Sequence, residues 1–102
     1  MKLVTLHNHF DQEHLDAVVA KMKVLGAPTI RCFDLGFDGL IQAIEGTHRI
    51  RACEILGLQP VLEFVGPNAA IANLNLDWDG AVDITTVSQL GDWENYSIEI
   101  DD

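Results

Sequence analysis

The chain has 102 residues, 48% of them hydrophobic and 22% charged, which is enough for one domain with a modest core and argues against wholesale disorder. Its formal net charge is −10: residues 1–65 carry 8 acids and 6 bases, whereas residues 66–102 carry 8 acids and no base. Because binding of nucleic acid depends on neutralising its phosphates with Lys and Arg, direct binding of nucleic acid is not expected.

The first half of the chain predicts a strand, a helix and a hairpin. Residues 1–6 form a short apolar strand, and Asp11 is placed to cap a helix that ends at Gly26. Residues 29–33 and 40–44 predict the two strands of a hairpin, because the residues between them are rich in Asp and Gly. The helix has one apolar face at helical spacing, formed by Leu15, Val18, Val19, Met22 and Leu25.

A second helix is predicted between Gly46 and Gly57, followed by a strand over residues 60–65 and a closing strand over residues 96–100. Residues 69–76 fit either a short helix or a strand, and residues 83–90 are ambiguous. The sequence therefore predicts an α+β fold, one domain over residues 1–102, in which residues 66–102 are the acidic C-terminal part. The buried face of the second helix is expected to consist of Ile50, Ala52, Cys53, Ile55 and Leu56.

The start of the second helix is the best place for a ligand. If Gly46 lets the chain leave the preceding strand sharply, with Thr47 near the N-cap, the free amides of the first turn point outward beside His48 and Arg49. Free amides, the positive end of the helix dipole and a guanidinium are what a phosphate needs. A plainer interpretation is that Thr47 only caps the helix, that His48 and Arg49 are solvated, and that Arg51 pairs with Glu54 or Glu45.

Two segments, FDQEHLDAVVAKMKVLGAPTIRCF and LIQAIEGTHRIRACEILGLQPVLEFV, resemble the ParB/sulfiredoxin superfamily and its ParB-like N-terminal nucleotide-binding domain. The resemblance runs from Phe10 to Val65 and includes the Gly-x-His-Arg-x-x-Ala pattern after the hairpin. It implies a small mixed sheet with one helix before the hairpin and the Gly-x-His-Arg helix after it. It also implies that Gly46 allows close approach of a phosphate and that His48 and Arg49 hold it.

The function expected from this resemblance is binding of a nucleoside triphosphate, ATP or CTP, with Mg²⁺ as the accompanying cation. The ligand is then contacted by Gly46, Thr47, His48 and Arg49, and the sequence leaves open whether a phosphate is hydrolysed or transferred. Glu45 is the candidate for a general base or a metal contact. Lys21 is the cationic candidate on the earlier helix.

The resemblance has limits at particular residues. Sulfiredoxin-like members place a reactive cysteine directly after the glycine, where this chain has Thr47, and Cys53 falls on the apolar side of the helix. Sulfiredoxin-type reduction is therefore not expected. The chromosome-partition members also carry a helix-turn-helix region that has no counterpart in this sequence, so a complete DNA clamp is not expected.

Two other kinds of site are open. His7, His9 and His14 could contribute to a metal site, although a metal needs three or four converging ligands. The acidic C-terminal part, with Trp78 and Trp93 among its acids, could instead make the chain a non-enzymatic interaction module or a nucleic-acid mimic that binds a basic protein partner.

A cytoplasmic location is expected, because the sequence has no apolar run long enough to cross a bilayer and no signal peptide at residues 1–10. In that compartment Cys32 and Cys53 are expected to be reduced, buried thiols rather than a disulfide.

Overall fold

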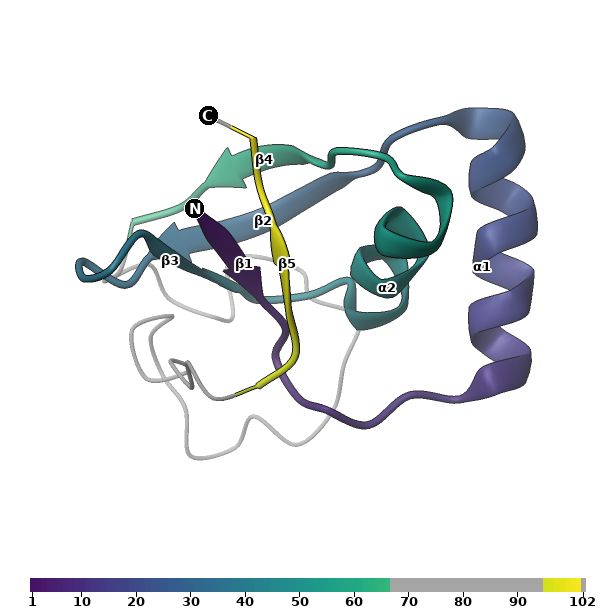
Figure 1. The fold of residues 1–102 in the computed structure, drawn as a ribbon, viewed down its shortest axis with the longest axis horizontal. Helices are drawn as coiled ribbons and strands as arrows, with labels where there is room; N and C mark the ends of the chain where they lie inside the picture. The colour runs from purple at the N-terminus through teal and green to yellow at the C-terminus, as the bar shows by residue number, and fades with distance from the viewer. Residues whose placement is uncertain (67–94, 102) are drawn as a thin grey trace.

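The computed structural model describes residues 1–66 and 95–101. The five strands of this part form one mixed sheet in the order β4-β2-β3-β1-β5 (Figure 1). β2 is antiparallel to β3, and β1 is antiparallel to β5, whereas the pairs β1/β3 and β2/β4 are parallel. The elements in chain order are β1 (Lys2–Val4), α1 (Gln12–Leu25), β2 (Thr29–Asp34), β3 (Leu40–Ala43), α2 (Thr47–Leu56), β4 (Val61–Phe64) and β5 (Ser97–Glu99).

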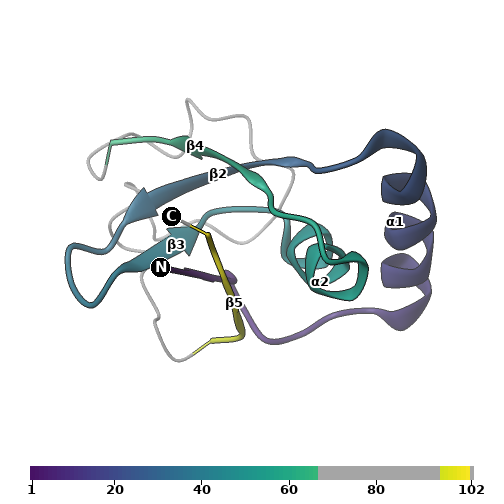
Figure 2. The ribbon, with the colours of Figure 1, turned by 45° about the horizontal axis from the view of Figure 1, so that its top comes forward.

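The two helices lie at one end of the sheet. Both ribbon views show α2 between α1 and the strands, and α1 packs against α2 (Figures 1 and 2). Neither of these described helices is long and apolar enough to cross a membrane. The fold is a small mixed α/β arrangement in which the N-terminus of α2 lies beside α1.

The predicted hairpin is confirmed, and its register follows from its turn. Cys32 pairs with Ala43, and the amide of Gly36 donates to the Asp34 carboxylate at 2.7 Å. Asp38, at φ 52°, and two glycines of the turn occupy the left-handed region, which non-glycine residues rarely adopt. The predicted strands at residues 60–65 and 96–100 are also confirmed, with the shorter bounds of β4 and β5.

Both predicted helices are confirmed, but only one has the expected cap. Asp11 caps α1, and its side chain accepts from the amide of Glu13. The N-cap of α2 is Gly46 rather than Thr47, which is the first helical residue. Thr47 therefore does not cap α2, and its hydroxyl makes no capping hydrogen bond.

The core is formed by apolar side chains from both helices and the strands. It contains Leu3, Leu15, Met22, Ile30, Cys32, Ile41, Ala43, Ile50, Ala52, Cys53, Ile98 and Ile100. Both cysteines are free and buried, as predicted, and burial raises the pKa of the Cys32 thiol to about 12 and that of Cys53 to about 11. Neither thiol is therefore suited to act as a nucleophile near neutral pH.

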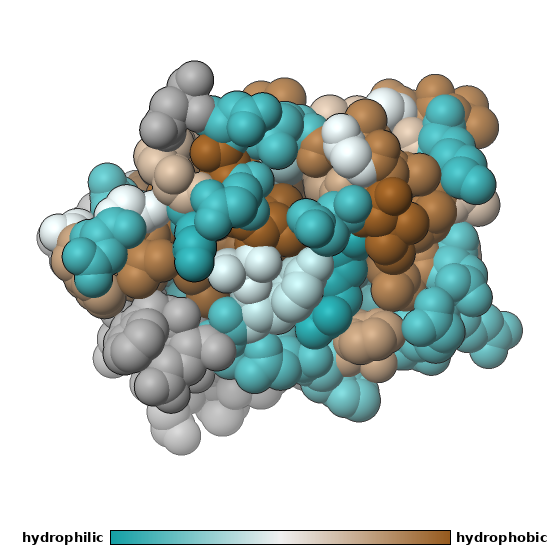
Figure 3. All heavy atoms as spheres, in the orientation of Figure 1, coloured by the Kyte–Doolittle hydropathy of each residue, from teal (hydrophilic) through white to brown (hydrophobic). Residues whose placement is uncertain are grey.

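One residue on the apolar face of α1 is exposed, and one prediction about the buried face of α2 is wrong. Leu25 is 74% exposed, because it is the last residue of α1 and lines a pocket beside the helix end. Ile55 is 59% exposed, because five residues of helix turn it roughly 140° away from the buried Ile50. Figure 3 shows apolar side chains at the surface over this helical end of the molecule.

Candidate functional site

A pocket of about 600 Å³ lies where the N-terminus of α2 faces the side of α1. One wall is mainly apolar and comes from α1 and the loop after it, and a second comes from the segment that follows β1. All five residues that the sequence predicts as a site line this pocket: Glu45, Gly46, Thr47, His48 and Arg49. The remaining lining residues are Leu6, His7, His14, Val18, Lys21, Met22, Leu25, Gly26, Ala27 and Pro28.

Gly46 turns the chain from the sheet into α2. Its φ of 80° and ψ of 29° lie in the left-handed region, where a side chain is strained. A Cβ atom at this position would lie 2.7 Å from Cδ1 of Ile30 and 3.2 Å from Nη2 of Arg49. Both the left-handed backbone conformation and the lack of room for a Cβ atom therefore require glycine at the N-terminus of α2.

Thr47 is buried, with 7% of its surface exposed, and it lines the pocket. Its hydroxyl makes no hydrogen bond with any residue in the described ranges. Among the described residues, the fully buried side-chain polar atom without a partner is Nε of Arg51, so the Thr47 hydroxyl is accessible and can meet a ligand or water in the pocket. The first amides of α2 lie beside it, and a helix leaves these amides without intrahelical acceptors.

His48 is fixed by the first turn of α1. Its Nε2 accepts a hydrogen bond from the amide of Asp11 at 3.0 Å, and its ring stacks on His14 with centroids 4.2 Å apart. The pKa of His48 is lowered, first by burial and then by the neighbouring His14. The ring is therefore neutral and carries its proton on Nδ1, which remains available as a donor.

Glu45 is held by two guanidinium groups. Nε and Nη2 of Arg31 each donate to the carboxylate at 2.8 Å, and Nη2 of Arg49 lies 3.7 Å from Oε1. The pKa of Glu45 is lowered chiefly by the hydrogen bonds from Arg31, which makes the carboxylate a weak base. This geometry does not favour Glu45 as a general base; it favours a role in orienting the arginines.

Arg49 reaches back across the start of its helix. Nη1 donates to the carbonyl of Thr29 at 3.1 Å, and the guanidinium lies beside the space over Gly46. The side chain is still 37% exposed. Its charge therefore remains at the pocket, together with the ammonium of Lys21 from the facing wall.

Buried polar residues fix the segment after β1 that forms the second wall. The Thr5 hydroxyl donates to the carbonyls of His7 and Tyr96, and the Asn95 amide donates to the carbonyls of Thr5 and Leu6. The buried Gln42 amide donates to the same Thr5 carbonyl at 3.2 Å. This network holds Leu6 and His7 at the pocket.

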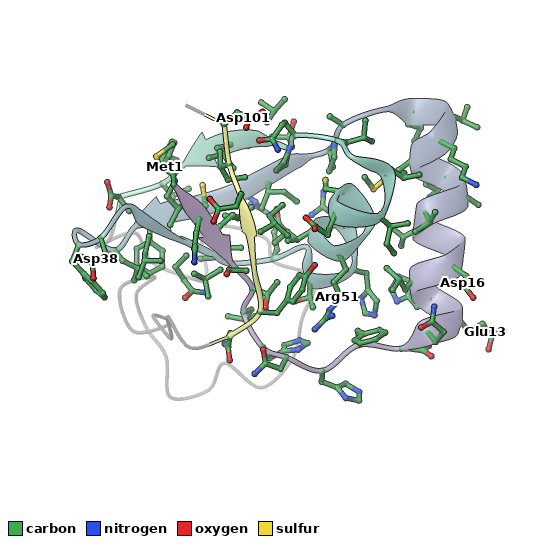
Figure 4. All side chains as sticks on the ribbon, viewed as in Figure 1. Met1, Glu13, Asp16, Asp38, Arg51 and Asp101 are labelled. Atoms are coloured by element: carbon green, nitrogen blue, oxygen red, sulfur yellow. The ribbon has the colours of Figure 1, made fainter. Side chains whose placement is uncertain are left out.

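The plainer interpretation assumed that Arg51 pairs with Glu54 or Glu45, but the structure shows neither pair. Its guanidinium lies between the rings of Phe10 and Tyr96, 4.2 Å and 4.1 Å from their centroids, and Nη2 donates to the carbonyl of Asn8. Figure 4 shows the side chain reaching from α2 toward the segment before α1. Arg51 therefore ties α2 to both the second wall and the residue that precedes β5.

The three histidines proposed for a metal do not converge. His7 and His9 lie 6.4 Å apart between ring centroids, whereas His14 stacks on His48 instead. Among residues 1–66 and 95–101, no group of three or more His, Cys, Asp or Glu side chains is placed to hold a metal ion. The acidic clusters around Trp78 and Trp93, and the uncertain segments 69–76 and 83–90, lie outside the described residues.

Comparison of the chain with protein-family models, with curated proteins and with solved structures gives no match.

Sequence reasoning missed the residues that support the site from a distance. Arg31 is one of them, although the hairpin turn offers a signal. The turn sets the register of the hairpin, in which the Arg31 carbonyl accepts a hydrogen bond from the amide of Ile44, and Ile44 directly precedes Glu45. The contact between Asp11 and His48 carries no comparable signal, because it joins two helix ends that are 37 residues apart.

Proposed function

We propose that this protein binds a nucleotide, with the phosphates at the N-terminus of α2. The observation that carries the proposal is the pocket-lining Thr47, whose hydroxyl has no partner among the described residues, at the start of a helix that opens into a pocket. The helix N-terminus attracts an anion through its free amides and its dipole, and Gly46 keeps the approach clear of a side chain.

The charges and the apolar wall support a nucleotide rather than a bare anion. Arg49 and Lys21 bring positive charge to the pocket, and Arg31 neutralises the carboxylate of Glu45, which also lines it. Val18, Met22 and Leu25 give the opposite wall an apolar surface, against which a base can lie. The cavity of about 600 Å³ falls in the usual size range of sites for small molecules.

The expected ligand is ATP or CTP with Mg²⁺, in the manner implied by the resemblance to the ParB/sulfiredoxin superfamily. The order of elements from α1 to β4 fits that resemblance, as does the position of Gly46, His48 and Arg49 at one helix mouth. His48 would donate to a phosphate oxygen from Nδ1, because Nε2 is occupied by the amide of Asp11. Glu45 would orient Arg49 rather than activate water.

A thermal-shift panel tests this function. Wild-type protein is heated with ATP, CTP, GTP, ADP or adenosine at millimolar concentration, with and without Mg²⁺. A ligand present at about 100 times its Kd stabilises the folded state by about 2.7 kcal/mol, which raises the Tm of a domain of this size by roughly 10 °C or more. At least one nucleotide should give such a shift, and adenosine, which has no phosphate, should not.

The matched variant is Thr47→Val, which keeps the shape of the side chain and removes only the hydroxyl. Because that hydroxyl has no partner among the described residues, the variant should unfold at the wild-type Tm or slightly above it. Its nucleotide shift should be reduced or lost. If no nucleotide shifts the wild-type Tm, or if Thr47→Val responds as the wild type does, the proposed site is wrong.

A further inference from the structure

The pocket holds a pair of stacked imidazoles where two helix N-termini meet. His14 belongs to the first turn of α1 and His48 to the first turn of α2, and their rings are 4.2 Å apart at an interplanar angle of 21°. Both rings line the pocket. Because His48 is partly buried and the positive ends of both helix dipoles lie here, a proton on His48 is disfavoured in the free protein.

The hydrogen bond between the amide of Asp11 and Nε2 of His48, at 3.0 Å, exists only while that nitrogen is unprotonated. If Nε2 gains a proton, two N–H donors face one another, and both then need an acceptor. An anionic oxygen in the pocket that accepts from the imidazolium compensates for the lost hydrogen bond and neutralises the new charge. The geometry therefore offers a protonated form of the site that is favourable only when an anion is present.

The other charged groups around His48 have opposing effects. His14 of α1, His7 of the segment after β1 and Arg51 of α2 itself lower the pKa of His48, whereas the carboxylate of Asp11 raises it. Lys21 and Arg49 line the same pocket, and Glu45, its carboxylate, is paired with arginine. The surroundings are therefore mainly cationic until a ligand brings negative charge.

We propose that the His14–His48 pair takes up one proton when a phosphate-like anion enters the pocket, so that anion binding strengthens as the pH falls. This inference rests on the proposed function, because it concerns the same site. It adds that the site is regulated by protons in the physiological range, in which histidine is the side chain that titrates. A bound dianion favours the charged imidazole, and by linkage the charged imidazole favours the dianion.

Inorganic sulfate is the probe that tests this proposal, because it stays a dianion over the pH range in which phosphate itself titrates. NMR signals of the imidazole rings are followed from about pH 8 to about pH 5, with and without sulfate. We expect sulfate to move the titration of the His48 ring to higher pH. We also expect sulfate to bind about three- to tenfold more tightly at about pH 6 than at about pH 8.

Three variants separate the roles of the histidines. His48→Gln keeps an oxygen that can accept from the amide of Asp11 but cannot titrate, and His14→Phe keeps a stacked ring without a titrating nitrogen. Either change should reduce the pH dependence of sulfate affinity, and both together should abolish it. His9→Gln is the matched control, because His9 is exposed and does not line the pocket, and it should keep the full pH dependence.

The outcomes distinguish this inference from the function on which it rests. Sulfate that binds in wild type but not in Thr47→Val, with equal affinity at both pH values and an unchanged imidazole titration, would refute the proton linkage and leave phosphate binding intact. If neither sulfate nor any nucleotide binds at either pH, both proposals fail. If His9→Gln loses the pH dependence while the double variant keeps it, the protonating group is not the stacked pair.

Discussion

Gly46→Ala should destabilise the protein through two effects that the structure separates. A residue with a Cβ atom in the left-handed region costs about 1–2 kcal/mol. The new Cβ also lies 2.7 Å from Cδ1 of Ile30, a core side chain with no exposed surface, and such overpacking costs about 1–3 kcal/mol. The expected loss in free energy of unfolding is therefore about 2–5 kcal/mol, a large part of the stability of a small domain.

Gly57→Ala is the matched control for this prediction. Gly57 caps the other end of α2 with a φ of 69°, yet nothing lies within 4 Å of its added Cβ. This variant should lose only the conformational part, about 1–2 kcal/mol. Urea denaturation followed by circular dichroism measures both variants, and losses that agree within about 0.5 kcal/mol would refute the close approach at Gly46.

Three further predictions concern charged side chains. The hydrogen bonds from Arg31 lower the pKa of Glu45 from 4.5, so the pair stabilises the fold above that pH and loses its contribution as the pH falls through the lowered pKa. Glu45→Gln should therefore reduce the free energy of unfolding by about 1–2 kcal/mol at neutral pH and by less in acid, as measured by urea denaturation. Arg51→Lys should cost about 1–2 kcal/mol in the same assay, because an ammonium cannot replace a flat guanidinium between two rings, and wild-type stability would contradict this. Lys21→Gln should weaken nucleotide binding about three- to tenfold by calorimetry, whereas Lys23→Gln, on the same helix but outside the pocket, should not.

The sequence predicted the elements that depend on local signals. Asp11 correctly predicted the start of α1, and the turn at residues 34–39 correctly predicted the hairpin, because caps and turns are encoded by residues a few positions apart. The parallel pairing of β1 with β3 and the antiparallel pairing of β1 with β5 could not be predicted, since no short-range pattern specifies which distant strands pair.

For the pocket, the sequence was informative at α2 and at Lys21 of α1, which also lines it. The sequence predicted a helix N-terminus at Gly46 and the polar turn after it, and that turn lies at the pocket. That Thr47 has no partner among the described residues, and that His48 accepts a hydrogen bond rather than donating one from Nε2, depend on contacts across the fold. Ile55 was assigned to the buried face of α2, although it lies roughly 140° around the helix from Ile50 and is 59% exposed.

The most direct test of phosphate binding at the N-terminus of α2 is a two-dimensional NMR titration of the backbone amides. Wild-type protein is titrated with ATP or CTP and Mg²⁺, and Thr47→Val is titrated in parallel. The amides of Gly46, Thr47, His48 and Arg49 should shift saturably in wild type and respond weakly in the variant, because these groups meet the phosphates. Absence of any saturable shift, or shifts that spare these four amides, would contradict the account.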